Sequence, residues 1–102
     1  MSRWQIFKRA INSIPLEKIF DRKTLIQKVG IDNITTIDMY FRLICRLGIA
    51  EKVSRGKYIL HRKIPQDLNT ITAYKILTIF DQPWHKWFVT LEDKIEIAKK
   101  QL

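Results

Sequence analysis

The chain has 102 residues and a net charge of +9, and this size predicts either one domain or one domain with an appended helix. Its composition, 46% hydrophobic and 28% charged, excludes an intrinsically disordered chain, and no apolar run approaches the ~20 residues of a membrane span. With a single cysteine, Cys45, an internal disulfide framework is excluded, and with no visible secretory signal we expect a soluble cytoplasmic protein.

The positive charge is concentrated in the first two-thirds of the chain. Residues 1–65 hold fourteen basic and five acidic residues, whereas residues 66–102 hold five of each. This distribution predicts a polyanionic partner for the first part only. The alternative is a surface charge that serves solubility alone.

The first predicted element is an amphipathic helix over residues 3–14, because its apolar residues recur every three or four positions. Pro15 restricts the residue before it and is expected to end this helix. A short extended link over residues 18–20 follows, in which we expect Ile19 and Phe20 to enter the core.

Two more helices are predicted between Asp21 and Gly48. Asp21 is a good N-cap for the first of them and Gly30 a good stop. The next runs over residues 35–47, where Thr35 and Asp38 have the spacing of a variant capping box. Its predicted buried side consists of residues at helical spacing: Ile37, Tyr40, Phe41, Ile44 and Leu47.

After Gly48 the periodicity changes to that of strands. Residues 50–54 and 57–62 predict a β-hairpin, and Gly56 supplies the positive φ that its tight turn requires. We expect one face of the hairpin to be covered and to carry Val53, Tyr58 and Leu60. The opposite face is expected to carry Lys52, Lys57 and Ile59.

The C-terminal part predicts two helices on either side of Pro83. The first covers residues 68–80, and its predicted apolar face consists of Ile71, Tyr74, Leu77 and either Ile76 or Phe80. For the second, we favour one long helix over residues 84–102. The alternative is a shorter helix that starts at the sequence 90–93, which resembles a helix N-terminus and leaves residues 84–89 extended.

The favoured long helix presents an aromatic and aliphatic seam. This seam either folds onto the first helix or pairs with a second copy of the chain in a homodimer. The residues expected to mediate that dimer are Trp84, Trp87, Phe88, Leu91 and Ile95.

The order helix, turn, helix, hairpin over residues 21–62 resembles the winged helix-turn-helix family. Residues 23–30 match the first helix of the motif, 35–49 the recognition helix and its exit, and 50–60 the wing. The resemblance implies a mainly α fold with a small β-hairpin, in which 1–65 form a winged helix-turn-helix domain and 66–102 an extension of additional C-terminal helices. It also implies a recognition helix in the DNA major groove and a wing on the backbone or minor groove.

The side chains expected to contact double-stranded DNA lie on these elements and are mostly basic. They are Arg9, Arg22, Lys23, Thr35, Thr36, Met39, Arg42, Arg46, Lys52, Arg55 and Lys57. The structural alternative is that Thr35 only caps its helix and that the arginines are ordinary solvated residues. Asp38 weighs against a helix that faces DNA, because phosphates repel a carboxylate.

No catalytic or metal site is expected. His61 has no carboxylate at helical spacing, and two histidines with one cysteine far from them do not make a zinc site. The sequence therefore predicts a protein without cofactor or enzymatic activity. The resemblance to the winged helix-turn-helix family, together with the basic charge of residues 1–65, favours a small transcriptional regulator that binds a specific DNA sequence and acts by blocking or recruiting polymerase.

Two other functions remain open from the sequence. One is a protein–protein interaction module with a surface formed by Met39, Leu43 or Ile59. The other is a nucleic-acid binder without sequence preference, acting in replication or in a viral complex.

Overall fold

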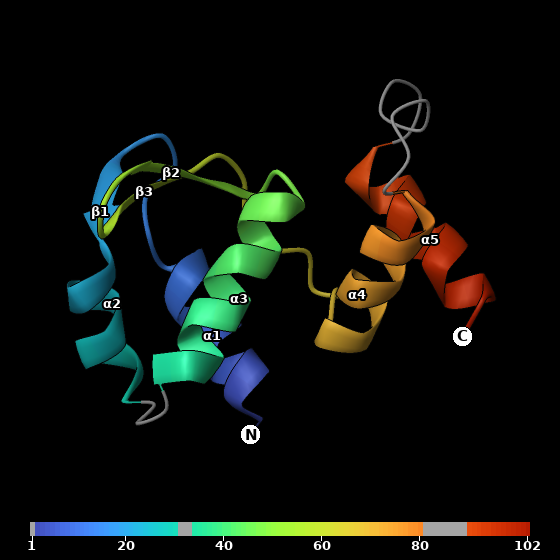
Figure 1. The fold of residues 1–102 in the computed structure, drawn as a ribbon, viewed down its shortest axis with the longest axis horizontal. Helices are drawn as coiled ribbons and strands as arrows, with labels where there is room; N and C mark the ends of the chain where they lie inside the picture. The colour runs from blue at the N-terminus through green and yellow to red at the C-terminus, as the bar shows by residue number, and fades with distance from the viewer. Residues whose placement is uncertain (1, 31–33, 81–89) are drawn as a thin grey trace. The chain divides into compact units, whose positions relative to one another are not determined.

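The computed structural model describes residues 2–30, 34–80 and 90–102. The chain divides into two compact units, Met1–Ile64 and Pro65–Leu102, and the sequence placed this boundary one residue later. The described residues of unit 1 form six elements (Figure 1): α1 (Arg3–Asn12), β1 (Ile19–Asp21), α2 (Arg22–Val29), α3 (Ile34–Arg46), β2 (Ala50–Ser54) and β3 (Lys57–Leu60). Unit 2 contains α4 (Thr70–Ile79) and α5 (Leu91–Lys100).

The described part of the chain is mainly helical with a small antiparallel sheet, which confirms the predicted fold class at that level. The sheet has three strands in the order β1-β3-β2. β1 was expected to be an extended link, but Ile19 pairs with Ile59 and Asp21 with Lys57. The prediction that Ile19 enters the core was wrong, because its side chain is exposed, whereas Phe20 is half-buried.

Aromatic side chains form the core of unit 1. Trp4 and Phe7 on α1 meet Tyr40 on α3, with ring centroids 5.2 Å from Tyr40 in both cases. Phe7 also contacts Phe41 edge-on at 5.3 Å. The inner face of α3 is therefore packed against α1. Most of the predicted buried side of α3 is confirmed, but Leu47 is half-buried, and Leu43, which was not placed on that side, is buried.

Both ends of α2 were predicted correctly. The Asp21 side chain accepts a hydrogen bond from the Lys23 backbone N–H at 2.9 Å, and Gly30 ends the helix in the left-handed conformation. The start of α3 differs from the prediction. α3 begins at Ile34, so Thr35 lies inside its first turn and is not the N-cap, and Asp38 forms an ion pair with Arg22 instead of completing a capping box.

The hairpin is confirmed, with Gly56 at φ 75° in its turn, although β3 ends at Leu60, two residues before the predicted end. Tyr58 and Leu60 are buried as expected. Val53 is exposed, contrary to the prediction. The reason is a shift of register between Lys52 and Ser54: a bulge leaves one extra residue unpaired and breaks the alternation of sides.

In unit 2, α4 was predicted correctly as a helix, but only part of its predicted apolar face is buried. Ile76, one of the two alternatives for that face, is buried, whereas Ile71 and Tyr74 are 66% and 44% exposed and Leu77 is half-buried. Thr72 and Ala73, which were not predicted, complete the buried face. α4 packs against α5, and these two small side chains let the helices approach closely.

The favoured long helix over residues 84–102 was wrong, and the alternative start is the one observed. Thr90 has an extended backbone and its side chain accepts a hydrogen bond from the Asp93 N–H at 3.2 Å, so α5 begins at Leu91. Among the residues expected to form a dimer seam, Ile95 is already buried within the single chain and Leu91 is half-buried. Trp84, Trp87 and Phe88 lie outside the described residues. Of the helices that the structure describes, none is long and apolar enough to cross a membrane.

Unit 1 is closed by hydrogen bonds between the end of α1 and the segment after β3. The Asn12 side chain accepts from the Ile64 backbone N–H at 2.7 Å and donates to the Ile64 carbonyl at 3.1 Å. The Lys63 ammonium donates to the carbonyls of Asn12 and Ile14 at 2.7 and 2.8 Å. The Asn12 side chain therefore satisfies both backbone groups of Ile64, as a neighbouring strand would in a sheet.

Replacing Asn12 with alanine is expected to lower the free energy of unfolding by about 1–3 kcal/mol, because both backbone groups of Ile64 lose their partners in a partly buried place. Chemical denaturation of the full chain measures this change. Gln27→Ala, at an exposed position of α2, is the control. A loss no larger than that of the control would contradict the assigned role of Asn12.

A surface cluster of His61, Glu17 and Glu51 joins the loop before β1 to the hairpin. His61 hydrogen-bonds through Nδ1 with Glu17 at 3.1 Å and through Nε2 with Glu51 at 3.2 Å. These carboxylates, Glu17 more than Glu51, raise the pKa of His61 above its ordinary value. The fold therefore favours the protonated imidazole.

The stability that this cluster contributes should depend on pH. Because the folded pKa is the higher one, the contribution is fully present below the unfolded pKa of about 6.5 and is lost as the pH rises through the folded pKa. We expect His61→Gln to lower the melting temperature at about pH 5.5 and to have little effect at about pH 9. A difference from wild type that stays constant across this range would contradict the cluster's role.

Candidate nucleic-acid interface

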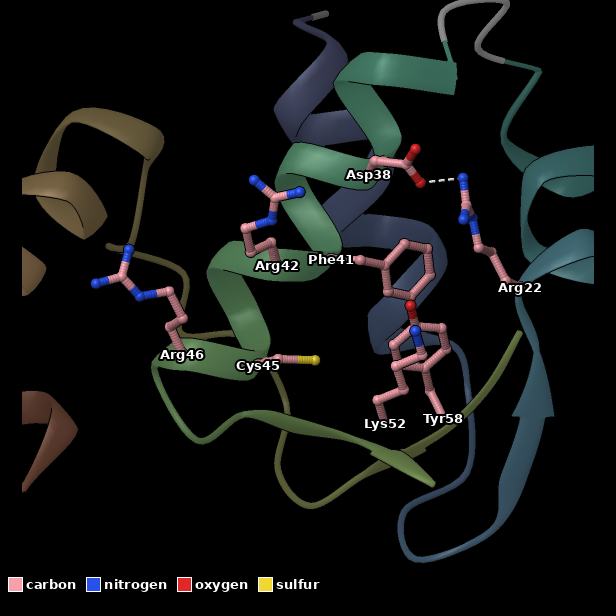
Figure 2. Close-up of a pocket in the computed structure, with 8 residues that line it drawn as sticks. All are labelled: Arg22, Asp38, Phe41, Arg42, Cys45, Arg46, Lys52 and Tyr58. Carbon is pink, nitrogen blue, oxygen red and sulfur yellow. Dashed lines mark ion pairs between the residues drawn. The ribbon is translucent and has the colours of Figure 1, made fainter. Parts of the chain in front are cut away.

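A groove of about 490 Å³ lies alongside α3 and brings together side chains from α2, α3, β2 and β3. We call it the basic groove, because four of its eight lining residues are cationic and one is acidic. Its lining consists of Arg22, Asp38, Phe41, Arg42, Cys45, Arg46, Lys52 and Tyr58 (Figure 2).

Helical spacing and a backbone contact place the cations of the groove. Asp38, Arg42 and Arg46 are four residues apart on α3 and so share one side of that helix. Arg22 is the first residue of α2, and its backbone N–H donates to the carbonyl of Gly56 in the hairpin turn at 2.9 Å. The start of α2 is therefore tied to the hairpin, which brings Arg22 opposite α3.

The floor of the groove is aromatic. Phe41 on α3 and Tyr58 on β3 stack with ring centroids 4.6 Å apart and an angle of 23° between their planes. Both residues are buried. Charges above such a floor are screened less than charges in open water, so their interaction with an anion is stronger.

An ion pair spans the groove from α2 to α3. Arg22 and Asp38 form it, with side chains 26% and 45% exposed, and Figure 2 shows the two facing each other between the helices. Arg42 and Lys52 form no ion pair with any described residue. Arg46 extends away from this pair (Figure 2). The groove therefore carries an excess of positive charge around one paired carboxylate.

Two uncharged groups of the groove keep their protons at neutral pH. Burial raises the pKa of the Cys45 thiol and, as the largest effect, that of the Tyr58 hydroxyl. A protonated tyrosine hydroxyl can donate a hydrogen bond to an anion in the groove.

At the edge of the sheet, Asp21 joins the start of α2 to β3. The backbone N–H of Lys23 and, after it, the Lys57 ammonium lower the pKa of Asp21. The carboxylate therefore stays ionised and pairs with Lys57 at 3.3 Å. Lys57 is thus partly neutralised, unlike Arg42 and Lys52.

Of the eleven side chains predicted to bind DNA, the groove brings together four: Arg22, Arg42, Arg46 and Lys52. The others lie elsewhere on unit 1. Exposed on α1, α2 and the hairpin are Arg9, Lys23, Arg55 and Lys57, and in the first turns of α3 are Thr35, Thr36 and Met39.

The sequence did not identify Phe41, Cys45 and Tyr58 as lining residues, although it placed Phe41 and Tyr58 in the core. It also did not connect Asp38 with Arg22. The two positions lie on different helices, and no periodicity relates them. Their pairing follows from how α2 packs beside α3.

Comparisons of the chain with protein-family models, with curated proteins and with solved structures gave no match. The arrangement of unit 1 and the charge of its groove therefore carry the functional argument.

The single cysteine provides a chemical probe of the groove. Because the pKa of Cys45 is raised, we expect the folded protein to react with iodoacetamide more slowly than the denatured chain at about pH 8.5. The folded rate should continue to rise at pH values where the denatured rate has levelled off. Mass spectrometry follows the reaction, and identical pH profiles for folded and denatured chains would contradict the burial of this thiol.

Proposed function

We propose that this protein binds double-stranded DNA, with α3 in the major groove and the basic groove against the phosphate backbone, and that it acts as a small sequence-specific transcriptional regulator. The observation that carries this proposal is the convergence of four cations from α2, α3 and β2 in one groove: Arg22, Arg42, Arg46 and Lys52. Phosphate contacts by such cations supply most of the affinity of proteins for DNA.

The shape of α3 suits the major groove. An α-helix fits that groove, and residues near its N-terminal end contact base edges. The side of α3 that carries Tyr40 and Phe41 is buried in unit 1, whereas Thr35, Met39 and Arg42 are exposed. Exposed side chains near the start of α3 are thus available for base contacts, and Arg42 can donate two hydrogen bonds to a guanine.

The order of elements supports the same proposal. α2 and α3 follow one another and lead directly into the β2–β3 hairpin, which is the arrangement expected of a winged helix-turn-helix domain. In that arrangement the hairpin is the wing, and the exposed Arg55 at its turn would contact the backbone or minor groove.

The alternative of a protein-interaction surface finds less support. Of the three apolar residues expected to form it, Leu43 is 2% exposed and Ile59 is half-buried. Met39 alone is exposed, and one side chain does not make an apolar patch. A binder without sequence preference would use the same basic groove, so only a binding experiment separates it from a regulator.

The proposal is tested by salt-titrated fluorescence anisotropy with duplex DNA. Each phosphate contact contributes about −0.9 to the slope of log affinity against log salt, so Arg46→Ala with Lys52→Ala should reduce the magnitude of that slope by about 2. Arg3→Ala with Lys18→Ala is the control of equal charge, because both residues are exposed and neither lines the groove.

Equal effects of the two double variants would show that only net charge matters and would overturn the assigned interface. Selection from a random-sequence duplex pool then tests sequence preference. We expect a consensus sequence for the wild type and a weaker one for Arg42→Ala. No enrichment would favour the binder without sequence preference.

A further inference from the structure

The ion pair between Arg22 and Asp38 leaves Arg22 incompletely satisfied. A guanidinium has five N–H donors, and the Nε atom of Arg22 is buried without a hydrogen-bond partner, the single such side-chain atom found in the described part of the chain. A buried donor without an acceptor costs free energy. The arginine is thus held by Asp38 in an arrangement that does not use its full donor capacity.

A phosphate group would use that capacity better. Phosphate oxygens accept two parallel hydrogen bonds from Nε and Nη of one guanidinium, and this bidentate geometry is the one that arginine favours. The Arg22 guanidinium is partly exposed and lines the groove, so a rotation of its side chain would bring Nε and Nη to the same anion.

Most of the residues around the Arg22–Asp38 pair favour the binding of a phosphate group. Arg42 and Lys52 line the same groove and form no ion pair with a described residue, so they attract a phosphate that enters. The buried Phe41–Tyr58 stack beneath them reduces screening. The carboxylate of Asp38 is the acidic group in the lining, and it opposes the entry of any anion.

We propose that the basic groove is a phosphate-binding site in which the Asp38 carboxylate occupies the place of the phosphate, and that an entering phosphate displaces Asp38 from Arg22. This inference rests on the proposed function, in which the phosphate belongs to duplex DNA. Asp38 then acts as an internal competitor: it lowers the affinity of the groove for every phosphate and keeps Arg22 paired while the groove is empty.

The side chain of Arg22 reports the exchange directly in ¹⁵N–¹H NMR spectra of arginine Nε–Hε groups, with its signal assigned by its loss in Arg22→Lys. Inorganic phosphate and a short DNA duplex are titrated separately into the wild-type chain. We expect the Arg22 signal to shift with both, because Nε gains an acceptor. This measurement depends on no destabilising variant.

A binding experiment with two matched variants accompanies it. We expect Asp38→Asn to tighten phosphate and duplex binding about two- to fivefold, which is the change in affinity that corresponds to the free energy of an exposed ion pair. Glu51→Gln is the control, because Glu51 is also an exposed carboxylate in an ion pair of unit 1, with His61, but does not line the groove.

The outcomes separate this inference from the proposed function. If duplex DNA binds while the Arg22 signal does not move, or if Asp38→Asn changes the affinity no more than Glu51→Gln does, the displacement of Asp38 is overturned and DNA binding stands. If no duplex binds at low salt but inorganic phosphate shifts Arg22, the proposed function fails and the groove is a site for a free phosphate group. If neither ligand moves Arg22, the phosphate site itself is overturned.

Discussion

The packing of Phe41 fixes the orientation of α3, and the site depends on that orientation. Its ring lies 5.3 Å from Phe7 on α1, 4.6 Å from Tyr58 on β3 and 6.3 Å from Phe20 on β1. One side chain thus joins α3 to three other elements of unit 1. Successive residues on a helix point about 100° apart, so holding Phe41 inward turns Arg42 outward. Loss of this ring would remove the contact that orients Arg42 and Arg46, the two cations of the groove on α3.

The first residues of α2 provide the second constraint. Asp21 caps α2 and pairs with Lys57 on β3, while Arg22 bonds through its backbone to Gly56 and through its side chain to Asp38. Two consecutive residues thus connect α2 with the hairpin and with α3. The geometry of the groove therefore depends on the hydrogen bonds and ion pairs of Asp21 and Arg22 as well as on the aromatic core.

Local signals in the sequence were sufficient to predict most element boundaries, but they were not sufficient to predict which residues line the basic groove. Asp21, Gly30 and Gly56 mark the ends of α2 and the hairpin turn by their own conformational preferences, so they could be predicted. β1 has three residues, too few to show the alternation of buried and exposed side chains that marks a strand. Val53 lies at a bulge, which the periodicity of the sequence does not predict. The exposed cations of α3 were predictable from its buried face. The pair of Arg22 with Asp38 was not, because it follows from tertiary packing.

The ion pair with Arg22 also changes the effect that the charge of Asp38 has on an approaching anion. Seen as an isolated carboxylate on an exposed helix, it argues against DNA, because phosphates repel it. Paired with Arg22 it is neutralised, and the remaining cations leave the groove positive. In the complex with DNA proposed above, its opposition to phosphate would act equally on every duplex, so it would cancel from the ratio of specific to nonspecific affinity. Any preference for sequence in that complex would therefore come from side chains that contact bases, foremost Arg42, while Asp38 would weaken specific and nonspecific binding by the same factor.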